Sequence, residues 1–178
     1  MIREANFDLN GPLIYNNRYK QFYKRNESVS YVQKYDQVLM IRAAITVFGA
    51  DALLDFGFEW PDRIPDYLDH ELTKKNTHKL VQVYFDHYLF IKYKNKVYPF
   101  LGETDDESHR NQIYCCNQGW NFSEIKYKDE RKDKWSEVSH TPLFRLPSDW
   151  SNSQKFDFLI NFFNNAKTDI ESQLASGS

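Results

Sequence analysis

The residues whose types and spacing could carry out catalysis lie in the stretch NQGWNFSEIKYKDE, over 117–130. In an extended strand alternate side chains share a face, so Phe122, Glu124 and Lys126 would lie together. Metal-dependent nucleases hold Mg²⁺ with carboxylates and use a lysine to orient the attacking water. Asp105 or Asp106, in the upstream acidic stretch GETDDESHRN, would provide the second carboxylate. This interpretation predicts a nuclease that uses Mg²⁺, with Asp105, Asp106, Glu124 and Lys126 as its catalytic residues.

The Glu-x-Lys spacing also has a simpler interpretation as a solvent-facing strand. The chain contains 25 acidic and 23 basic residues among 178, so such a pair arises by chance in most chains of this composition. A half-exposed strand would alternate charged and apolar residues in the same way, and the run KYKDERKDK is typical of a solvated segment. The nuclease is therefore the alternative hypothesis.

A second set of residues could bind nucleic acid. In YNNRYKQFYKR, over 15–25, four cations interleave with four aromatic rings. Cations contact phosphates and rings stack on bases, which is the combination that single-stranded nucleic acid requires. An amphipathic helix whose lysine and arginine stems cover apolar surface would look the same. The leading hypothesis is a binding module that contacts nucleic acid through this basic-aromatic stretch, with the candidate residues Arg18, Tyr19, Lys20, Tyr23, Lys24 and Arg25.

Charge is segregated along the N-terminal half of the chain. After the basic-aromatic stretch, residues 51–71 hold seven acidic side chains against a single Arg63. Such polarity could steer a partner or bring the basic stretch of one protomer onto the acidic stretch of another. A third hypothesis is therefore a protein-interaction or self-assembling module.

Composition excludes several other classes of protein. The net charge of −2 provides no global positive field toward nucleic acid or membranes. No run approaches the about 20 apolar residues of a membrane span, and the N-terminus lacks a signal-peptide pattern, so we expect a cytoplasmic protein without membrane contact. The five histidines have no ligand spacing and the two cysteines, Cys115 and Cys116, are adjacent, so no metal site and no cofactor is predicted outside the nuclease interpretation.

The N-terminal half has mainly helical patterns. Residues 13–25 could form a short helix, and residues 30–49 form a clearer one. There Ser30 and Gln33 have capping-box spacing, Gly49 is a stop signal, and Tyr35 to Phe48 place apolar residues three to four apart, which predicts a central buried helix. Residues 51–57 are expected to add a helical turn, and 65–76 a further helix with Pro65 at its first position.

From His78 onward the apolar period changes to two, which is typical of strands. We expect successive antiparallel strands over 79–86, 88–94 and 96–101, with a tight connection at 94–96. An acidic loop over 102–111 and a hairpin formed by 112–116 and 120–128 should follow. Residues 141–147 are bounded by Pro142 and Pro147 and should form a short edge strand.

The last element is predicted to be a long amphipathic helix over 151–175. It opens with a second capping box, Ser151 and Gln154, and carries an apolar stripe at helical spacing. The expected fold is a single α+β domain over 1–175, with N-terminal helices, an antiparallel meander of about five strands, and this C-terminal helix packed on the sheet. Residues 176–178 should form a flexible tail. Phe158 and Phe162 widen the apolar stripe, which predicts a homo-oligomer, most simply a dimer, with both rings near the interface.

Overall fold

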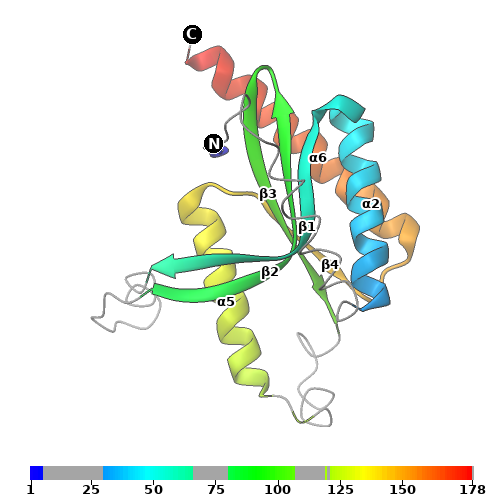
Figure 1. Ribbon diagram of the computed structural model, residues 1–178, viewed down its shortest axis with the longest axis vertical. Coiled ribbons are helices and arrows are strands. Elements are labelled where there is room, and N and C mark those ends of the chain that lie inside the picture. The colour runs from blue at the N-terminus through cyan, green and yellow to red at the C-terminus, as the bar shows by residue number, and fades with distance from the viewer. Residues whose placement is uncertain (6–29, 66–79, 107–118, 120, 178) are drawn as a thin grey trace.

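The computed structural model describes residues 1–5, 30–65, 80–106, 119 and 121–177 (Figure 1). The described elements, in chain order, are helix α2 (Tyr31–Phe48), the short 3₁₀ helix η1 (Ala50–Ala52), strands β1 (Leu53–Pro65), β2 (Leu80–Tyr93) and β3 (Lys96–Asp105), helix α5 (Phe122–Ser139), strand β4 (Leu143–Pro147) and helix α6 (Asn152–Ser176).

The sheet is mixed, and this corrects one of the expectations. Its described strands follow the order β1-β2-β3-β4. The first three pair antiparallel, whereas β4 pairs parallel to β3. Parallel neighbours cannot be joined by a tight turn, so the chain crosses over through α5 between β3 and β4. The α+β class is confirmed, but the antiparallel meander of about five strands is wrong.

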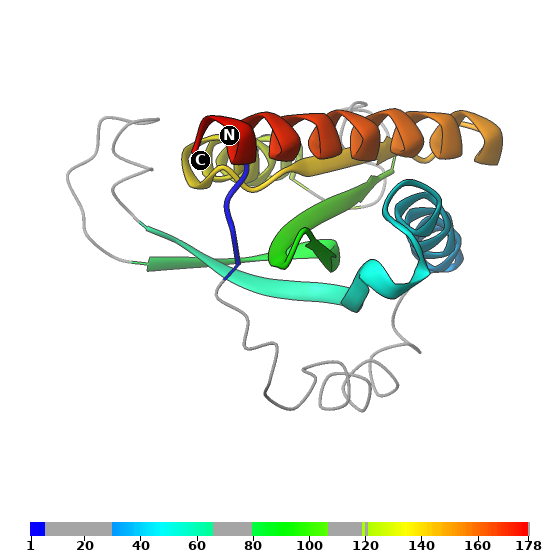
Figure 2. The same ribbon diagram turned by 90° about the horizontal axis from the view of Figure 1, so that it is seen from above.

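Helices cover both faces of the sheet. In the view from above, α2 and α5 lie on opposite sides of the strands (Figure 2). Helix α6 packs against α2. The larger apolar cluster joins α2 and α6 to one face through residues such as Met40, Phe100 and Phe163. The smaller cluster places Trp135 of α5 against the other face, beside Phe85 and other strand residues. Both helical layers therefore need the sheet between them to bury their apolar residues.

The helices α2 and α6 begin as the sequence predicts. Ser30 and Ser151 each accept a hydrogen bond from the backbone N–H three residues later, and Gln33 and Gln154 bond back to the cap residues. Both capping boxes are confirmed, and α6 buries Leu159, Phe163, Ala166 and Ile170 as its stripe requires. C-terminal helix packing on the remainder of the fold is likewise confirmed.

The buried face of α2 differs from the expected one. The structure buries Asp36, Gln37, Met40, Ala43 and Ala44. The large apolar residues Tyr35 and Val38 are instead 61% and 51% exposed. Small residues on the buried side allow α2 to lie close to α6, and the polar Asp36 finds its partners inside the fold.

The turn between β2 and β3 was correctly predicted, but the strand division was not. Lys94 and Asn95 have φ values of 50° and 64°, as a two-residue hairpin turn with right-handed twist requires. Before this turn β2 is one continuous strand from Leu80 to Tyr93, where the sequence suggested two. After it, β3 extends to Asp105, so the expected acidic loop begins within a strand.

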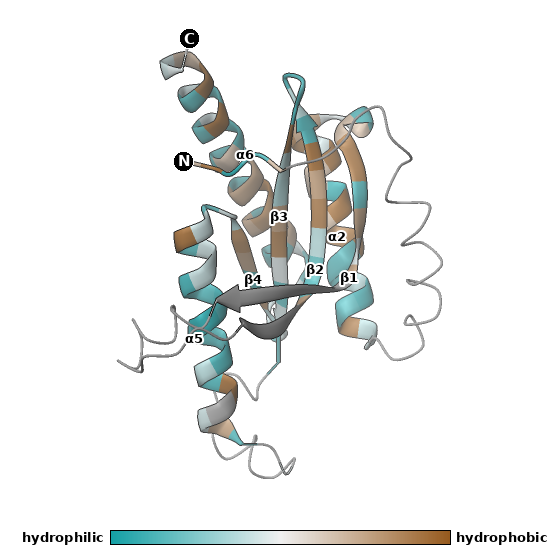
Figure 3. Ribbon diagram, turned by 60° about the vertical axis from the view of Figure 1, so that its left-hand side comes forward, coloured by the Kyte–Doolittle hydropathy of each residue, from teal (hydrophilic) through white to brown (hydrophobic). Residues whose placement is uncertain are grey.

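The secondary structure expected from the sequence is wrong for two segments. Residues from Leu53 onward form β1 and not a helical turn, although η1 supplies one short 3₁₀ turn before it. The stretch over 122–128 belongs to α5 and not to a hairpin strand. Figure 3 shows that α5 is hydrophilic along most of its length. Its packing residue Trp135 and the buried Arg131 lie four apart, on one helical face.

Several expectations fall outside the described residues. These are the helix over 13–25, the part of the 65–76 helix beyond Pro65, and the strand over 112–116. Pro65 itself ends β1. Across the described ranges, none of the helices combines the length and apolar character needed to cross a membrane.

The two phenylalanines proposed for a dimer interface have different surroundings. Phe162 packs against the core, with its ring 5.5 Å from Phe144 and 5.3 Å from Phe163. Phe158 is 37% exposed and contacts Phe162 and Trp150. Association through Phe158 stays a prediction, and Phe162 has an intramolecular role as well.

Candidate functional site

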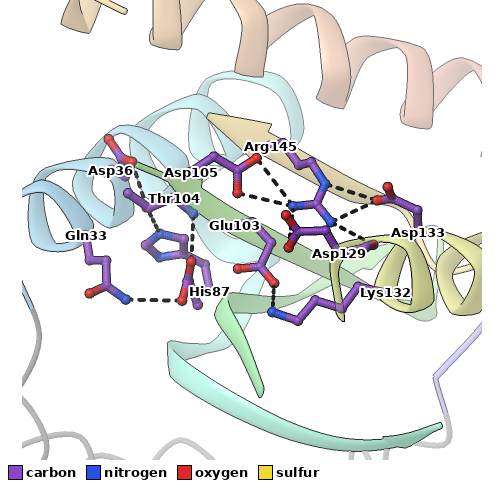
Figure 4. Close-up of polar contacts among 11 residues, drawn as sticks. Gln33, Asp36, His87, Glu103, Thr104, Asp105, Asp129, Lys132, Asp133 and Arg145 are labelled. Atoms are coloured by element: carbon purple, nitrogen blue, oxygen red, sulfur yellow. Dashed lines mark hydrogen bonds and ion pairs between the residues drawn. The ribbon is translucent and has the colours of Figure 1, made fainter. Parts of the chain in front are cut away.

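Polar side chains converge where β2 and β3 separate. The backbone pairing of these strands ends at His87 and Gly102. Beyond that point β2 turns away with β1, while β3 continues beside β4 (Figure 1). Charged residues from α2, β2, β3, β4 and α5 collect around this fork (Figure 4). They form three connected groups.

The first group is the acidic pair, Asp86 of β2 and Glu103 of β3. Glu103 is 1% exposed, whereas Asp86 keeps partial contact with solvent. Burial raises the pKa of Glu103 well above its usual value, and the charge of Asp86 and a hydrogen bond to Asp86 raise it further. A protonated Glu103 can donate that hydrogen bond, which removes the repulsion between the two carboxylates. Burial and the charge of Asp86 therefore both disfavour ionisation of Glu103 in this pair.

The acidic pair has contacts from three neighbouring elements. Lys132 of α5 forms an ion pair with Glu103 Oε1, and its ammonium lies 5.6 Å from the centre of the Phe85 ring. The backbone N–H of Thr104 donates to Asp86 Oδ2 over 2.9 Å, and Gln33 Nε2 of α2 donates to Asp86 Oδ1 over 3.3 Å. Lys132 lowers the pKa of Glu103 but does not offset burial and Asp86. The carboxylates are thus held in place with only part of their negative charge compensated.

The second group is the arginine cage, in which Arg145 of β4 lies among three aspartates. Its guanidinium is 3.2 Å from Asp105 Oδ1, 3.0 Å from Asp133 Oδ1 and 3.6 Å from Asp129 Oδ1. It also donates to the backbone oxygen of Asp129 over 3.2 Å. Burial lowers the pKa of Arg145, but the three aspartates outweigh burial and the net shift is upward. The guanidinium is therefore the cation that balances these three carboxylates.

The arginine cage borders a surface hollow of about 300 Å³. The hollow is lined by Asp105, Lys126, Asp129, Glu130, Asp133, Arg145 and Pro147. Asp105 and Lys126, two of the catalytic candidates from the sequence, thus lie beside the same hollow. Asp105 is already bound to Arg145 through both carboxylate oxygens.

The remaining sequence candidates are placed as follows. Asp106 lies just after β3, and Glu124 and Lys126 lie on α5. Both positions belong to a helix and not to a strand, so the shared strand face expected for them is wrong. The catalytic role of the four residues stays a prediction. The basic-aromatic stretch, from Arg18 to Arg25, lies outside the described residues.

The third group is the buried relay, on the side of the sheet that faces α2 and α6. Lys155 Nζ of α6 lies 2.8 Å from Asp36 Oδ1, and the Thr104 hydroxyl donates to Asp36 Oδ2 over 2.7 Å. His87 Nε2 lies 2.7 Å from the same hydroxyl. The Lys155 and Asp36 side chains are only 4% and 0% exposed. This chain of polar contacts passes through an otherwise apolar layer.

The absence of a side chain at Gly102 makes room for the Phe144 ring, which stacks on His87. A Cβ at Gly102 would lie 2.0 Å from Phe144 Cζ, so only glycine lets the Phe144 ring lie across the strand there. The rings of Phe144 and His87 stack with their centroids 6.2 Å apart. Burial lowers the pKa of His87 to about 4, although nearby Asp36 raises it, and Lys155 lowers it further. His87 is therefore neutral at physiological pH.

We expect His87 to make the fold less stable in mild acid. Its pKa is about 4 in the folded chain, whereas an exposed histidine has a pKa of 6.5, so the unfolded chain binds more protons between these values. The free energy of unfolding should therefore fall as the pH falls from 6.5 toward 4. Urea titrations of wild type and His87→Gln across this range measure the effect. An unchanged pH slope in the variant would assign the acid sensitivity to other groups.

Sequence reasoning missed the acidic pair and the buried relay. Asp86 interrupts the apolar run VQVYFDHYLF, and Glu103 follows the apolar run KVYPFLG. An isolated acid within a strand pattern was the available signal, because a buried charge is rare unless it is paired. Which residues pair depends on the strand register, and this is not encoded locally.

In the part of the chain that the structure describes, no group of three or more histidine, cysteine, aspartate or glutamate side chains has the geometry to hold a metal ion. Two carboxylates with water as the remaining ligands is nonetheless a common arrangement for Mg²⁺, which keeps several waters and binds substrate phosphates. No family model, curated protein or solved structure matches the chain, so its function is inferred from the geometry of these three groups.

Proposed function

We propose that the chain is a metal-dependent nuclease whose site is the acidic pair with Lys132. The observation that carries the proposal is the contact between Glu103 and Asp86, two carboxylates from adjacent strands at the point where the strands separate. A buried pair of like charges is costly, and either a proton or a cation relieves it. The site differs from the one expected at Glu124-x-Lys126, but it uses the same chemistry.

The residues present fit a divalent cation. Asp86 and Glu103 would hold it, and the partial exposure of Asp86 gives access from solvent. When bound, Mg²⁺ or Mn²⁺ provides positive charge that stabilises the phosphate oxygens during bond cleavage. The Thr104 N–H and Gln33 amide orient Asp86 and so preserve the site geometry. The arginine cage is a poorer candidate, because Arg145 already fills it.

Lys132 has the role that a nuclease lysine requires. Its ammonium, whose side chain is 13% exposed, lies on Glu103 at the edge of the site. There it can orient a water whose oxygen attacks phosphorus while the bond from phosphorus to the leaving oxygen breaks. It can also stabilise the negative charge that gathers on the phosphate oxygens. The lysine thus comes from the crossover helix and not from the strand that carries Glu103.

The proposed substrate class is nucleic acid. Arg18, Lys20, Lys24 and Arg25 offer cations for the phosphates, and the neighbouring rings offer surfaces for unstacked bases. These residues support the proposal only through their sequence. Under this proposal the binding function and the nuclease function, which were separate hypotheses, belong to one protein.

Cleavage of labelled single-stranded and duplex DNA and RNA tests the proposal. We expect activity with Mn²⁺ or Mg²⁺ that disappears with EDTA, and a loss of about a hundredfold or more in Glu103→Gln, Asp86→Asn and Lys132→Met. The matched control is Asp157→Asn, an exposed carboxylate on α6, which should retain full activity.

Metal binding provides the second measurement. Titration of Mn²⁺ followed by electron paramagnetic resonance should show one site in wild type and in Asp157→Asn, and none of similar affinity in Glu103→Gln. Glu103→Gln should also remain folded, because glutamine has nearly the same shape and removes the repulsion from Asp86, which offsets the lost ion pair with Lys132. A wild type that neither binds Mn²⁺ nor cuts any of the four substrates would contradict the proposal.

A further inference from the structure

Thr104 connects the buried relay to the acidic pair. Its hydroxyl lies on the side of β3 that faces α2, where it contacts Asp36 and His87 at 2.7 Å each. Its backbone N–H donates instead to Asp86, on the adjacent strand. The neighbouring residue Glu103 projects to the opposite face, toward Lys132. Thr104 therefore contacts both the buried relay and the acidic pair.

The protons of the relay can be assigned one by one. Ionised Asp36 only accepts hydrogen bonds, and Lys155 already donates to its Oδ1. The Thr104 hydroxyl has a single proton, which it donates to Asp36 Oδ2, so the same oxygen must accept from His87 Nε2. This assignment leaves Nδ1 of His87 as the bare nitrogen. Nδ1 has no hydrogen-bond partner among the described residues, as expected for a buried ring held by its other nitrogen.

The buried relay lies where the backbone pairing between β2 and β3 ends. The β2–β3 pairing ends at His87 and Gly102, one residue short of both Asp86 and Glu103. Past this point the bonds from Thr104 to His87 and to Asp86 take over the connection between the strands. An anchored Thr104 side chain fixes the rotation of β3 at this residue, and hence the directions of its own N–H and of Glu103.

We propose that Thr104 is a positioning residue for the proposed cation site: the buried relay of Lys155, Asp36 and His87 fixes its hydroxyl, and its N–H fixes Asp86. The proposal rests on the proposed nuclease function, which makes Asp86 and Glu103 a cation site. The contacts of Thr104 with the buried relay and with Asp86 are present without any metal. Thr104 does not touch the substrate, so its effect is transmitted entirely through Asp86 and Glu103.

The test compares Thr104→Val with Thr104→Ser. Valine has nearly the same shape but lacks the hydroxyl, whereas serine keeps it. Hydrogen exchange of the residue 104 amide, followed by NMR on metal-free protein, should be about tenfold faster in Thr104→Val and close to the wild-type rate in Thr104→Ser. The amides of Leu89 and Ile91, which lie in the paired part of β2, should be unchanged in both variants.

Mn²⁺ affinity provides the functional measurement. Loss of a group that orients a metal ligand typically weakens binding by about ten- to a hundredfold. We expect such a loss in Thr104→Val and recovery in Thr104→Ser. Equal exchange at residue 104 in all three proteins would overturn the positioning role. So would faster exchange spread evenly over β2, or wild-type Mn²⁺ affinity in Thr104→Val. Absence of Mn²⁺ binding to wild type would overturn the nuclease proposal, while the exchange rates would still decide the role of Thr104.

Discussion

Replacing Asp36 by leucine is expected to lower the free energy of unfolding by about 3–5 kcal/mol, the usual cost of breaking a buried ion pair. The Lys155 ammonium would lose its partner at 2.8 Å while its side chain stays 4% exposed, so an uncompensated charge would remain in the apolar layer between α2 and α6. The Thr104 hydroxyl would also lose its acceptor. Urea unfolding at neutral pH measures the change.

A double variant distinguishes the contribution of the Asp36–Lys155 ion pair from that of the surrounding apolar packing. Asp36→Leu combined with Lys155→Met removes both charges and keeps most of the side-chain volume. Replacing a buried ion pair by apolar residues is often neutral or stabilising, so the double variant should lie closer to wild type than either single variant. The coupling energy from the double-mutant cycle should therefore be large. Strictly additive losses would show that the two charges do not stabilise each other.

Local hydrogen-bond signals made part of the fold predictable. The two capping boxes need only residues that lie three apart, and the two-residue turn at Lys94 and Asn95 needs only its own backbone conformation. Such signals work because the groups involved are neighbours in the sequence. They identified α2, α6 and the β2–β3 connection.

The incorrect assignments concern segments whose structure depends on distant residues. In α5, the alternation of Phe122, Glu124 and Lys126 imitates a strand, while the burial of Arg131 and Trp135 becomes evident only when the sheet lies against them. In β1, the run that includes Phe56 and Phe58 is too short to distinguish a helix from a strand by its apolar period. Pairing with β2 over most of its length makes this segment a strand.

The candidate site was less predictable than the fold. Asp86 and Glu103 are 17 positions apart and contact each other only because β2 and β3 pair in one register. Lys132 comes from a helix whose first residues, 122–128, were expected to form a hairpin strand. Asp105, which the sequence also singled out, is found in an ion pair with Arg145, and its catalytic role stays a prediction. Local spacing can identify charged residues, but register determines which of them meet.

Replacing Arg145 by leucine should destabilise the fold by about 3 kcal/mol and create a calcium-binding site. The side chains of Asp105 and Asp129 are only 14% and 18% exposed, so removal of the guanidinium leaves close like charges in a partly buried place. The expected loss in the free energy of unfolding is at the low end for a buried ion-pair network, because Asp133 is 59% exposed and water can screen its charge. Arg145→Lys keeps one charge but cannot reach all three aspartates, so it should lose less.

Calcium should restore much of the stability lost in Arg145→Leu. Three carboxylates and the backbone oxygen of Asp129 now face the guanidinium, and oxygen ligands of this kind are the ones that Ca²⁺ prefers. In the wild type the three carboxylates lack the geometry of a metal site, so in the variant they would have to move closer together around Ca²⁺. Ca²⁺ at about a hundred times its dissociation constant would stabilise the folded chain by about 2.7 kcal/mol. The experiment uses the Glu103→Gln background, so that the acidic pair contributes no calcium response of its own. Melting temperatures with and without CaCl₂ should then rise for Arg145→Leu and stay constant for the parent. Equal responses in the two proteins would mean that the aspartates move apart once Arg145 is removed, and that the guanidinium, not the backbone, holds them together.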